Sequence, residues 1–472
     1  MWLTGSIPEC INQGMSSHQS NECHADQTPS AAACPTLFPL DPAPAPGNRR
    51  PLAEDPKRGA RLRQANRAQI TFGRIDLDRA LPQDHSARAI WAVVEQLDLS
   101  ALYAQIEARD EVAGASAIDP KILLGLWVYA TSEGEGSARE IQRLTELHAA
   151  YRWICGGVAV GYHTLSDFRS QQAAVIDGLI SQILALLMQQ DLVELSRVAQ
   201  DGTRVRARAG AGSFRREQTL QKLMEEARAH LQELTKEASD PAISARKAAA
   251  RKRGAAERLA RLEAALKQIP EVTETKKRSG AKDAQVRVST TDPDARVMKM
   301  GDGGFRPAFN VQFATTTDQA RVIVGVDVTK RGSDMGETSA MLEQIEKRTG
   351  VRPREILVDG GYPQHAAVDR ASELGVTLYA PLPKPREGDA RDPHVPRAGD
   401  SEAVAAWRTR MASEEAKQIY KQRAATAETV NADAKAHRGL NGMAMRGLGK
   451  ALGSACLFAL TYNALRLITL RG

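Results

Sequence analysis

The sequence predicts an α/β domain that carries an inserted helical hairpin and follows an all-α N-terminal domain. Three observations support this fold class. Apolar residues recur at three- and four-residue spacing from about 85 to 195, helix formers fill 214–268, and β-rich runs alternate with helices further on. At 472 residues the chain is long enough for two or three domains with a sizeable core.

Composition indicates a globular protein, with 42% hydrophobic and 26% charged residues. The net charge of +7 is a mild bias toward polyanionic partners that many unrelated proteins share. Five scattered cysteines without CxxC spacing indicate neither a disulfide framework nor a zinc ribbon, and they favour a reducing cytoplasm. No secretory signal is expected. The apolar tract ACLFALTYNALRLITL falls short of the ~20 residues of a membrane span and contains Asn463 and Arg466, so a core helix is expected.

The N-terminal part divides into a tail and a helical domain. Residues 1–65 are rich in Pro, Ser, Ala and Asn without a sustained period, which predicts a disordered tail. The helical domain is expected over 70–195, with Asp119 as an N-cap and Ser137 and Glu140 as a capping box after a glycine turn. Two helices joined by that turn resemble a DNA-binding helix-turn-helix, and an ordinary helical bundle fits equally well.

A short strand is predicted over 196–201, ending at Asp201. Residues 214–268 then form the predicted hairpin, with leucines along both arms and the breaker Ser239-Asp240-Pro241 between them. The second arm is strongly basic. It either lies on DNA or presents a solvated charged face, which is the commoner case.

After about residue 290 the pattern is that of alternating strands and helices. The runs FNVQFATT and ARVIVGVDVT predict an antiparallel hairpin, and EILVD predicts a strand ending at Asp359. A long helix over about 411–437 carries Glu428, and an apolar helix follows. The order strand, insertion, strand, strand, helix, strand, helix, strand, helix matches a ribonuclease H-like catalytic domain, expected over 196–470, by analogy of fold. That fold places acids on its first strand, after its fourth strand and on a later helix, as found here.

The three acids Asp201, Asp359 and Glu428 are therefore candidates for one metal site. Carboxylate oxygens are preferred ligands of Mg²⁺ and Mn²⁺, and converging acids repel one another unless a cation neutralises them. Two ions at such a site catalyse displacement at phosphorus. Each acid alone has a structural explanation: an Asp-Gly turn for Asp201, a strand-end turn for Asp359 and a surface position for Glu428.

The helix around Glu428 strengthens its candidacy. Tyr420, Arg423, Glu428 and Lys435 follow the pattern Y-x2-R-x4-E-x6-K, and at 100° per residue all four fit one half of an α-helix. Such a face combines an acid that binds metal with cations and a phenol that hold the DNA backbone.

The chain resembles bacterial insertion-sequence transposases of the DDE class, in the branch with the Tyr-Arg-Glu-Lys helix signature and an all-helical N-terminal domain. The similarity covers roughly residues 70–470. The motifs that carry it are DPKILLGLWVYATSEGEGSAREIQRL, YRWICGG, YHTLSDFR, DGTRVRARAG, TDPDARVMKMGDGGFRPAFNVQFA, ILVDGGY, YKQRAATAETVNADAK and RGLGKALGSACLFALTYNALRL.

The resemblance implies that Asp201, Asp359 and Glu428 form the catalytic, metal-binding triad, with Mg²⁺ or Mn²⁺ as two ions. It also implies that Tyr420, Arg423 and Lys435 contact DNA at the element's ends. Metal-activated water would cut at those ends, and the exposed 3′-hydroxyl would attack target DNA. Joining two ends implies a homodimer in the active complex. The resemblance also implies a location in the bacterial cytoplasm, at the nucleoid.

Two departures from the family accompany this resemblance. Four residues separate Arg423 from Glu428 where some relatives have three. The 381–400 loop lacks the strand-rich insertion of larger relatives, so a hairpin excision route has no support.

Two other functions remain open: a stand-alone metal-dependent nuclease and a catalytically inactive DNA-binding regulator descended from a transposase. Asp327 is expected to be structural, while Asp334 and Asn310 are candidates to support the site.

Overall fold

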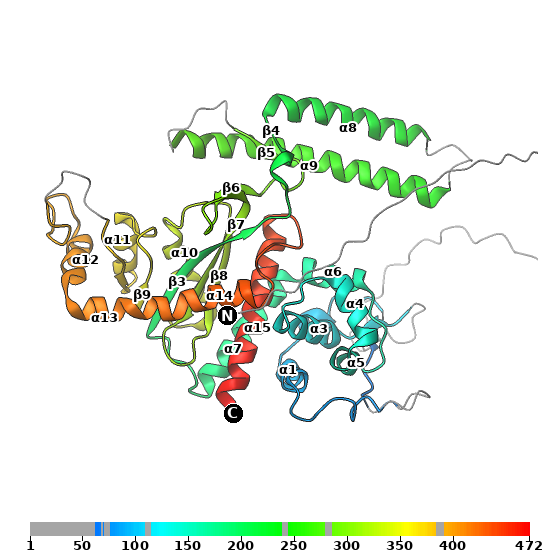
Figure 1. Cartoon of the computed structure of the whole chain (residues 1–472), viewed down its shortest axis with the longest axis horizontal. Helices are drawn as coiled ribbons and strands as arrows, with labels where there is room; N and C mark the ends of the chain where they lie inside the picture. Colours follow the sequence, from blue (N-terminus) through cyan, green and yellow to red (C-terminus); the bar gives the residue numbers. More distant parts are fainter. Residues whose placement is uncertain are drawn as a thin grey trace, which may run out of the picture. The chain divides into compact units, whose positions relative to one another are not determined.

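The N-terminal region of the computed structural model is helical (Figure 1). The structure describes residues 62–67, 69, 76–108, 115–237, 244–278, 286–383 and 391–472. The predicted tail, 1–65, lies outside these residues except for 62–65, where Leu62–Arg63 (β1) pairs with Ala117–Ile118 (β2) in parallel. The helices of this region are α1 (Ser86–Glu95), α2 (Ser100–Tyr103), α3 (Pro120–Ser132), α4 (Ala138–Leu147), α5 (Ala149–Cys155), α6 (Tyr162–Gln171) and α7 (Ala173–Gln189).

Local capping explains where two of these helices begin. The Asp119 carboxylate accepts from the Lys121 backbone N–H at 2.9 Å and starts α3. Ser137 caps α4 by accepting from the Glu140 N–H at 3.3 Å. The expected return bond of the capping box comes from a different residue: Glu135 accepts from the Ser137 N–H at 2.5 Å, while Glu140 pairs with Arg143.

A mixed sheet forms the centre of the α/β region. Its strands lie in the order β10-β9-β3-β7-β6, and β8 also pairs with β7. Strand β7 is antiparallel to β3, β6 and β8, whereas β3, β9 and β10 are parallel to one another. The strands are β3 (Arg197–Arg206), β6 (Arg296–Lys299), β7 (Phe305–Thr316), β8 (Ile323–Thr329), β9 (Glu355–Leu357) and β10 (Thr377–Tyr379).

Strand β3 is longer than predicted, and Asp201 lies in its middle rather than at its end. The prediction ended the strand at the Asp-Gly pair, which usually marks a turn. Pairing with β7 continues through Gly202 as far as Arg206, and Thr203 and Val205 alternate toward the interior. The tertiary pairing therefore overrides the local turn signal.

The helices of the α/β region follow the predicted order, except that α12 was not predicted. They are α10 (Glu337–Thr349), α11 (His365–Glu373), α12 (Glu402–Ala412), α13 (Glu414–Arg423), α14 (Thr429–Ala436) and α15 (Leu448–Arg471). The predicted long helix over 411–437 begins at Glu414, because Ser413 ends α12 and caps α13 by accepting from the Ala416 N–H. It also contains a π-helical turn, η3 (Ala424–Glu428), which contacts β3 and β7.

Helix α15 is a core helix, as expected from its sequence. It is long and apolar enough to cross a membrane by length and composition, but 67% of its apolar window is buried. It packs against α7, α3 and β8. The side-chain amide of Asn463 accepts from the Ile323 N–H on β8 at 2.8 Å and donates to the Ile323 carbonyl at 2.7 Å. The polar residue that argued against a membrane span therefore connects this helix to the sheet.

The inserted segment is a pair of long helices, α8 (Glu217–Glu237) and α9 (Ala245–Arg278), which lie side by side (Figure 1). Leu220, Leu262 and Ile269 form a separate small core between them. At the base, Phe214–Arg215 (β4) pairs with Val288–Ser289 (β5) in antiparallel fashion. The second arm extends ten residues beyond the predicted end at 268, because α9 continues through Pro270.

Candidate active site

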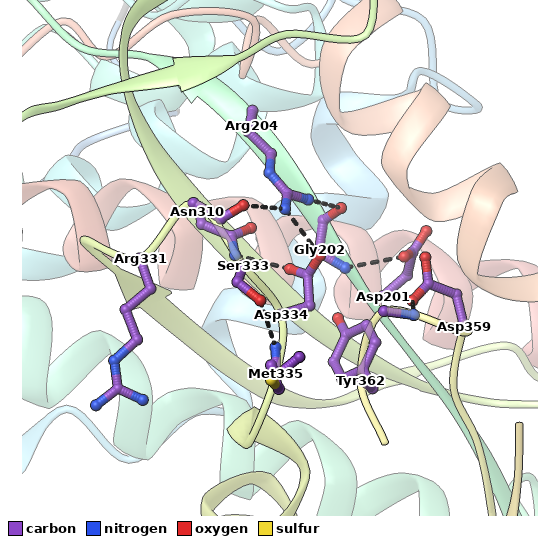
Figure 2. A network of polar contacts seen from close by, with 12 residues as sticks. Asp201, Gly202, Arg204, Asn310, Arg331, Ser333, Asp334, Met335, Asp359 and Tyr362 are labelled. Atoms are coloured by element: carbon purple, nitrogen blue, oxygen red, sulfur yellow. Dashed lines mark hydrogen bonds and ion pairs between the residues drawn. The ribbon is translucent and has the colours of Figure 1, made fainter. Parts of the chain in front are cut away.

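Asp201 lies within β3, and Asp359 lies two residues after the end of the neighbouring parallel strand β9. The last register pair between β3 and β9 is Ala199 with Leu357, and each aspartate follows its member of that pair by two residues. A two-residue step restores the same face of a strand, so both carboxylates lie on one side of the sheet. Strand β9 ends at Leu357 while β3 continues beside β7, and Figure 2 shows the two carboxylates next to each other where the strands part.

Arg423 connects Asp201 with Glu428. Its guanidinium lies 2.9 Å from the Asp201 carboxylate and 3.3 Å from that of Glu428. The Arg423 side chain is only 11% exposed and that of Asp201 15%, whereas the Glu428 side chain is 60% exposed. Asn431, one helical turn after Glu428, donates from its amide to the second oxygen of Asp201 at 3.0 Å. Asp201 is therefore held by two residues of the helix that carries Glu428.

A π-helical turn lies between Arg423 and Glu428. The turn covers Ala424–Glu428 and so includes all four residues that separate Arg423 from Glu428. A π turn adds one residue to a helix without breaking it, and such turns are frequent at functional sites. The 100° step of a continuous α-helix, which was assumed for the Tyr420–Lys435 pattern, therefore does not hold across this turn. Glu428 is the last residue of the turn, and Lys435 lies seven positions later in α14.

The charges of this cluster influence one another. Burial raises the pKa of Asp201, and the nearby Asp359 raises it further, although Arg423 opposes both effects. The pKa of Arg423 is raised because Asp201, Tyr420 and Asp359 outweigh the effect of burial. Two neighbouring carboxylates in a partly desolvated position favour the binding of a cation. In this structure the guanidinium of Arg423 supplies the positive charge.

The sheet brings the two aspartates together, whereas Glu428 joins them only through Arg423. Among the residues that the structure describes, no three His, Cys, Asp or Glu side chains lie close enough to hold a metal ion. The donors present still suit a hard divalent cation. Asp201 and Asp359 supply carboxylate oxygens, and the buried Oδ1 of Asn431, beside Asp201, has no hydrogen-bond partner in the described part of the chain.

A buried polar network supports the strand that carries Asp201 (Figure 2). Asp334 accepts from the amides of Asn310 and Gln312, both at 2.7 Å, and pairs with Arg204 at 2.8 Å. The hydroxyl of Tyr362, which follows Asp359 in the chain, donates to Gln312. The network therefore connects β3, β7 and the segment after β9 beneath the two aspartates.

Gly202 is what allows this network to lie next to Asp201. A Cβ atom at position 202 would be 2.2 Å from Asp334 Oδ1 and 2.3 Å from Gln312 Nε2. Asp334 and Asn310, which were candidates to support the site, both belong to the network. Asp327 lies on β8, and its carboxylate accepts from the neighbouring Val328 N–H at 2.7 Å, outside the network.

The two other residues of the helix signature are half-buried near the acids. Burial raises the pKa of Tyr420, as do Asp359, Asp201 and Glu428. Burial lowers the pKa of Lys435, with a further contribution from Arg204 and an opposing one from Asp201. Both residues therefore interact electrostatically with the Asp201 region, as Arg423 does by direct contact.

Sequence reasoning missed Asn431, Gln312 and Tyr362 as members of this site. Asn431 had a detectable signal, because a residue three positions after Glu428 lies on the same helical face. Tyr362 stood within the motif ILVDGGY without an assigned role. Gln312 had no local signal, since its position depends on the pairing of β7 with β3.

Two family models match the chain. Residues 75–171 match a family described as "Transposase domain (DUF772)", and residues 388–468 match one described as "Transposase DDE domain". The first match covers the N-terminal helices α1 to α6, and the second covers Tyr420, Arg423, Glu428 and Lys435. Asp201 and Asp359 lie between the two matched segments.

No curated protein and no solved structure shows significant similarity to the chain. Both matched segments contain motifs on which the resemblance to transposases was based. One falls on the helical N-terminal region and the other on the helix that carries Glu428. The two matches support an insertion-sequence transposase of the DDE class.

Proposed function

We propose that this transposase binds the inverted-repeat ends of its insertion sequence, cleaves them by metal-activated hydrolysis and joins the 3′-hydroxyl to target DNA. The observation that carries the proposal is the matching position of Asp201, on β3, and Asp359, just after the adjacent parallel strand β9. Arg423 connects Asp201 with Glu428. Clustered carboxylates on one side of a sheet suit phosphodiester chemistry.

We also propose a ribonuclease H-like fold for the catalytic domain, residues 196–470, with the 214–268 region as its helical insertion and 70–195 as a DNA-binding domain. The strand arrangement supports this. The first strand, β3, lies between the antiparallel β7 and the parallel β9, with β8 and β10 outside them. Asp201 lies on the first strand, β3, and Asp359 follows β9, which is the fourth strand if the additional edge strand β6 is left out, while Glu428 lies on a later helix.

The proposed triad is Asp201, Asp359 and Glu428. Mg²⁺ or Mn²⁺, as two ions, would activate the attacking water and stabilise the leaving oxygen. Asp201 and Asp359 would hold metal from the sheet, with Asn431 orienting Asp201. Glu428 would contribute from the helix, because its exposed side chain is free to turn once Arg423 releases it.

Tyr420, Arg423 and Lys435 are the proposed contacts to DNA phosphates at the element's ends. Their shared location beside the acids supports this, since the phosphate next to the cut bond must come close to all of them. For Arg423 the role requires that the guanidinium leave Asp201, which metal binding at Asp201 would favour by replacing its positive charge. Joining two ends further implies that the active complex is a homodimer on DNA.

The function is tested with DNA that carries the inverted repeats flanking the gene. Wild-type protein and Asp359→Ala are incubated with this DNA and Mg²⁺ or Mn²⁺, and nicks at the ends and joined products are measured. We expect end-specific cleavage and strand transfer by the wild type alone. Cleavage without joining of a pre-cut end would identify a nuclease, and equal products from both proteins would show that Asp359 is not part of the site.

A further inference from the structure

A basic groove lies between the C-terminal half of α9 and the sheet, apart from the acids. It has a volume of about 1100 Å³. Its floor and walls come from the base of the insertion, from β6 and the start of β7, and from the loop after β8. The residues that line it are Ala211, Phe214, Glu271, Val272, Glu274, Thr275, Lys276, Arg278, Arg287, Arg296, Val297, Phe305, Lys330, Arg331, Gly332 and Ser333. We call it the insertion groove.

The insertion groove carries an excess of positive charge. Six of its lining residues are Lys or Arg and two are Glu. Both glutamates are already paired, Glu271 with Lys330 at 2.7 Å and Glu274 with Arg278 at 3.1 Å. Arg287 is exposed and forms no ion pair with the described residues, and the 70% exposed Arg331 side chain has only a 3.5 Å contact with Glu337. These two arginines are available to an anionic ligand.

Exposed apolar side chains accompany these cations. Phe305, the first residue of β7, is 69% exposed, and Val297 on β6 is 51% exposed. An exposed aromatic ring among arginines is typical of nucleic-acid surfaces, where the ring packs against a sugar or an unstacked base while the cations hold phosphates.

The insertion groove is connected to the active site by the loop after β8. Arg331, Gly332 and Ser333 line the groove, and the next residue, Asp334, belongs to the network beneath Asp201. Arg204 spans the two sites, since its guanidinium donates to the Gly332 carbonyl at 2.7 Å and to Asp334 at 2.8 Å. Figure 2 shows Arg331 pointing away from the two aspartates, while Asp334 on the same loop lies beside Gly202.

We propose that the insertion groove binds the phosphate backbone of the DNA that flanks the bond cut at the active site. Arg287 and Arg331 would contact phosphates, and Phe305 would pack against a sugar or base. This inference rests on the proposed function. It assigns DNA contact to the base of the insertion, rather than to the basic run near Arg253 on the exposed part of α9.

The test measures DNA affinity at several salt concentrations in metal-free buffer. Fluorescence anisotropy with a labelled duplex of the element's end is recorded for wild type, Arg287→Ala, Arg331→Ala, Arg287→Lys and the control Arg253→Ala. We expect each groove alanine variant to bind more weakly and to reduce the slope of log K against log salt by about one, since one phosphate contact is lost. Arg287→Lys keeps the slope, because the charge is retained, and Arg253→Ala behaves as wild type.

The Phe305→Ala variant distinguishes whether the insertion groove binds DNA or a second protein chain. If the groove binds DNA, this variant weakens DNA binding without changing the salt slope and leaves self-association in sedimentation velocity unchanged. Unchanged DNA affinity in all groove variants, or a loss confined to self-association, would overturn the proposal. Because binding is measured without metal, this result is independent of whether the protein cuts DNA, which the cleavage assay decides separately.

Discussion

The guanidinium of Arg423 lies 2.9 Å from the carboxylate of Asp201, inside the cluster of acids rather than on the outer surface of its helix. The same guanidinium contacts Glu428, so one buried cation connects two of the three proposed catalytic acids. A divalent ion at Asp201 would supply the same kind of charge. In the absence of metal, Arg423 therefore offsets the repulsion between Asp201 and Asp359.

Removing Arg423 alone should destabilise the protein. Arg423→Gln leaves Asp201 desolvated next to Asp359 without its cation, a loss of about 3 kcal/mol in the free energy of unfolding. Adding Asp201→Asn removes the unpaired charge and should recover most of the loss. Urea unfolding of the wild type, both single variants and the double variant measures the coupling. Additive losses would show that the ion pair contributes nothing to stability.

Lys435 should contribute to binding of the element's ends through its charge. Lys435→Ala is expected to weaken binding and to lower the salt slope by about one, because a phosphate contact releases counterions. Lys450 on α15 is exposed and serves as the matched control. Equal slopes for wild type and both alanine variants, measured by anisotropy, would remove Lys435 from the proposed contacts.

Gly202→Ala should disrupt the network beneath Asp201. The new methyl group would overlap Asp334 and Gln312, both of which are buried and held by hydrogen bonds. We expect a lower melting temperature and strongly reduced end cleavage. Gly212→Ala is the control, because a Cβ there meets no atom within 4 Å. Normal cleavage by Gly202→Ala would mean that the network does not position Asp201.

Glu337→Gln should stabilise the protein at neutral pH. Burial raises the pKa of Glu337, with further contributions from Asp327 and Asp334, and Arg331 opposes the shift. The folded state therefore binds its proton more tightly than the unfolded state, and wild-type stability falls as pH rises from the unfolded pKa through the higher folded pKa. We expect Glu337→Gln to melt at a higher temperature than wild type at pH 8. The difference should shrink toward pH 4.5, and a constant difference would contradict the assignment.

Patterns of period and capping were sufficient to predict the types of most elements, because they depend on neighbouring residues. The β7–β8 hairpin, the strand before Asp359 and the Asp119 cap are examples. The extent of β3 was not predictable in this way. Its last five residues are held by pairing with β7, more than a hundred positions away in the sequence.

The active site shows the same limit. Asp201, Asp359 and Glu428 were recognisable as acids in suitable local patterns. The position of Arg423 between two of them depends on the π-helical turn and on contact of that turn with β3, which no helical period predicts. The bonds of Gln312 to Asp334 and Tyr362 likewise depend on strand register.

The most direct test of the account is single-turnover cleavage of a labelled element end with Mg²⁺ by Asp201→Asn, Asp359→Asn and Glu428→Gln. Asp327→Asn is the control, an acid on the neighbouring β8 outside the cluster. We predict that each of the three loses at least about 100-fold in rate while still binding the end, as expected for metal ligands, and that the control cleaves as wild type. Wild-type cleavage by any of the three would contradict the proposed triad.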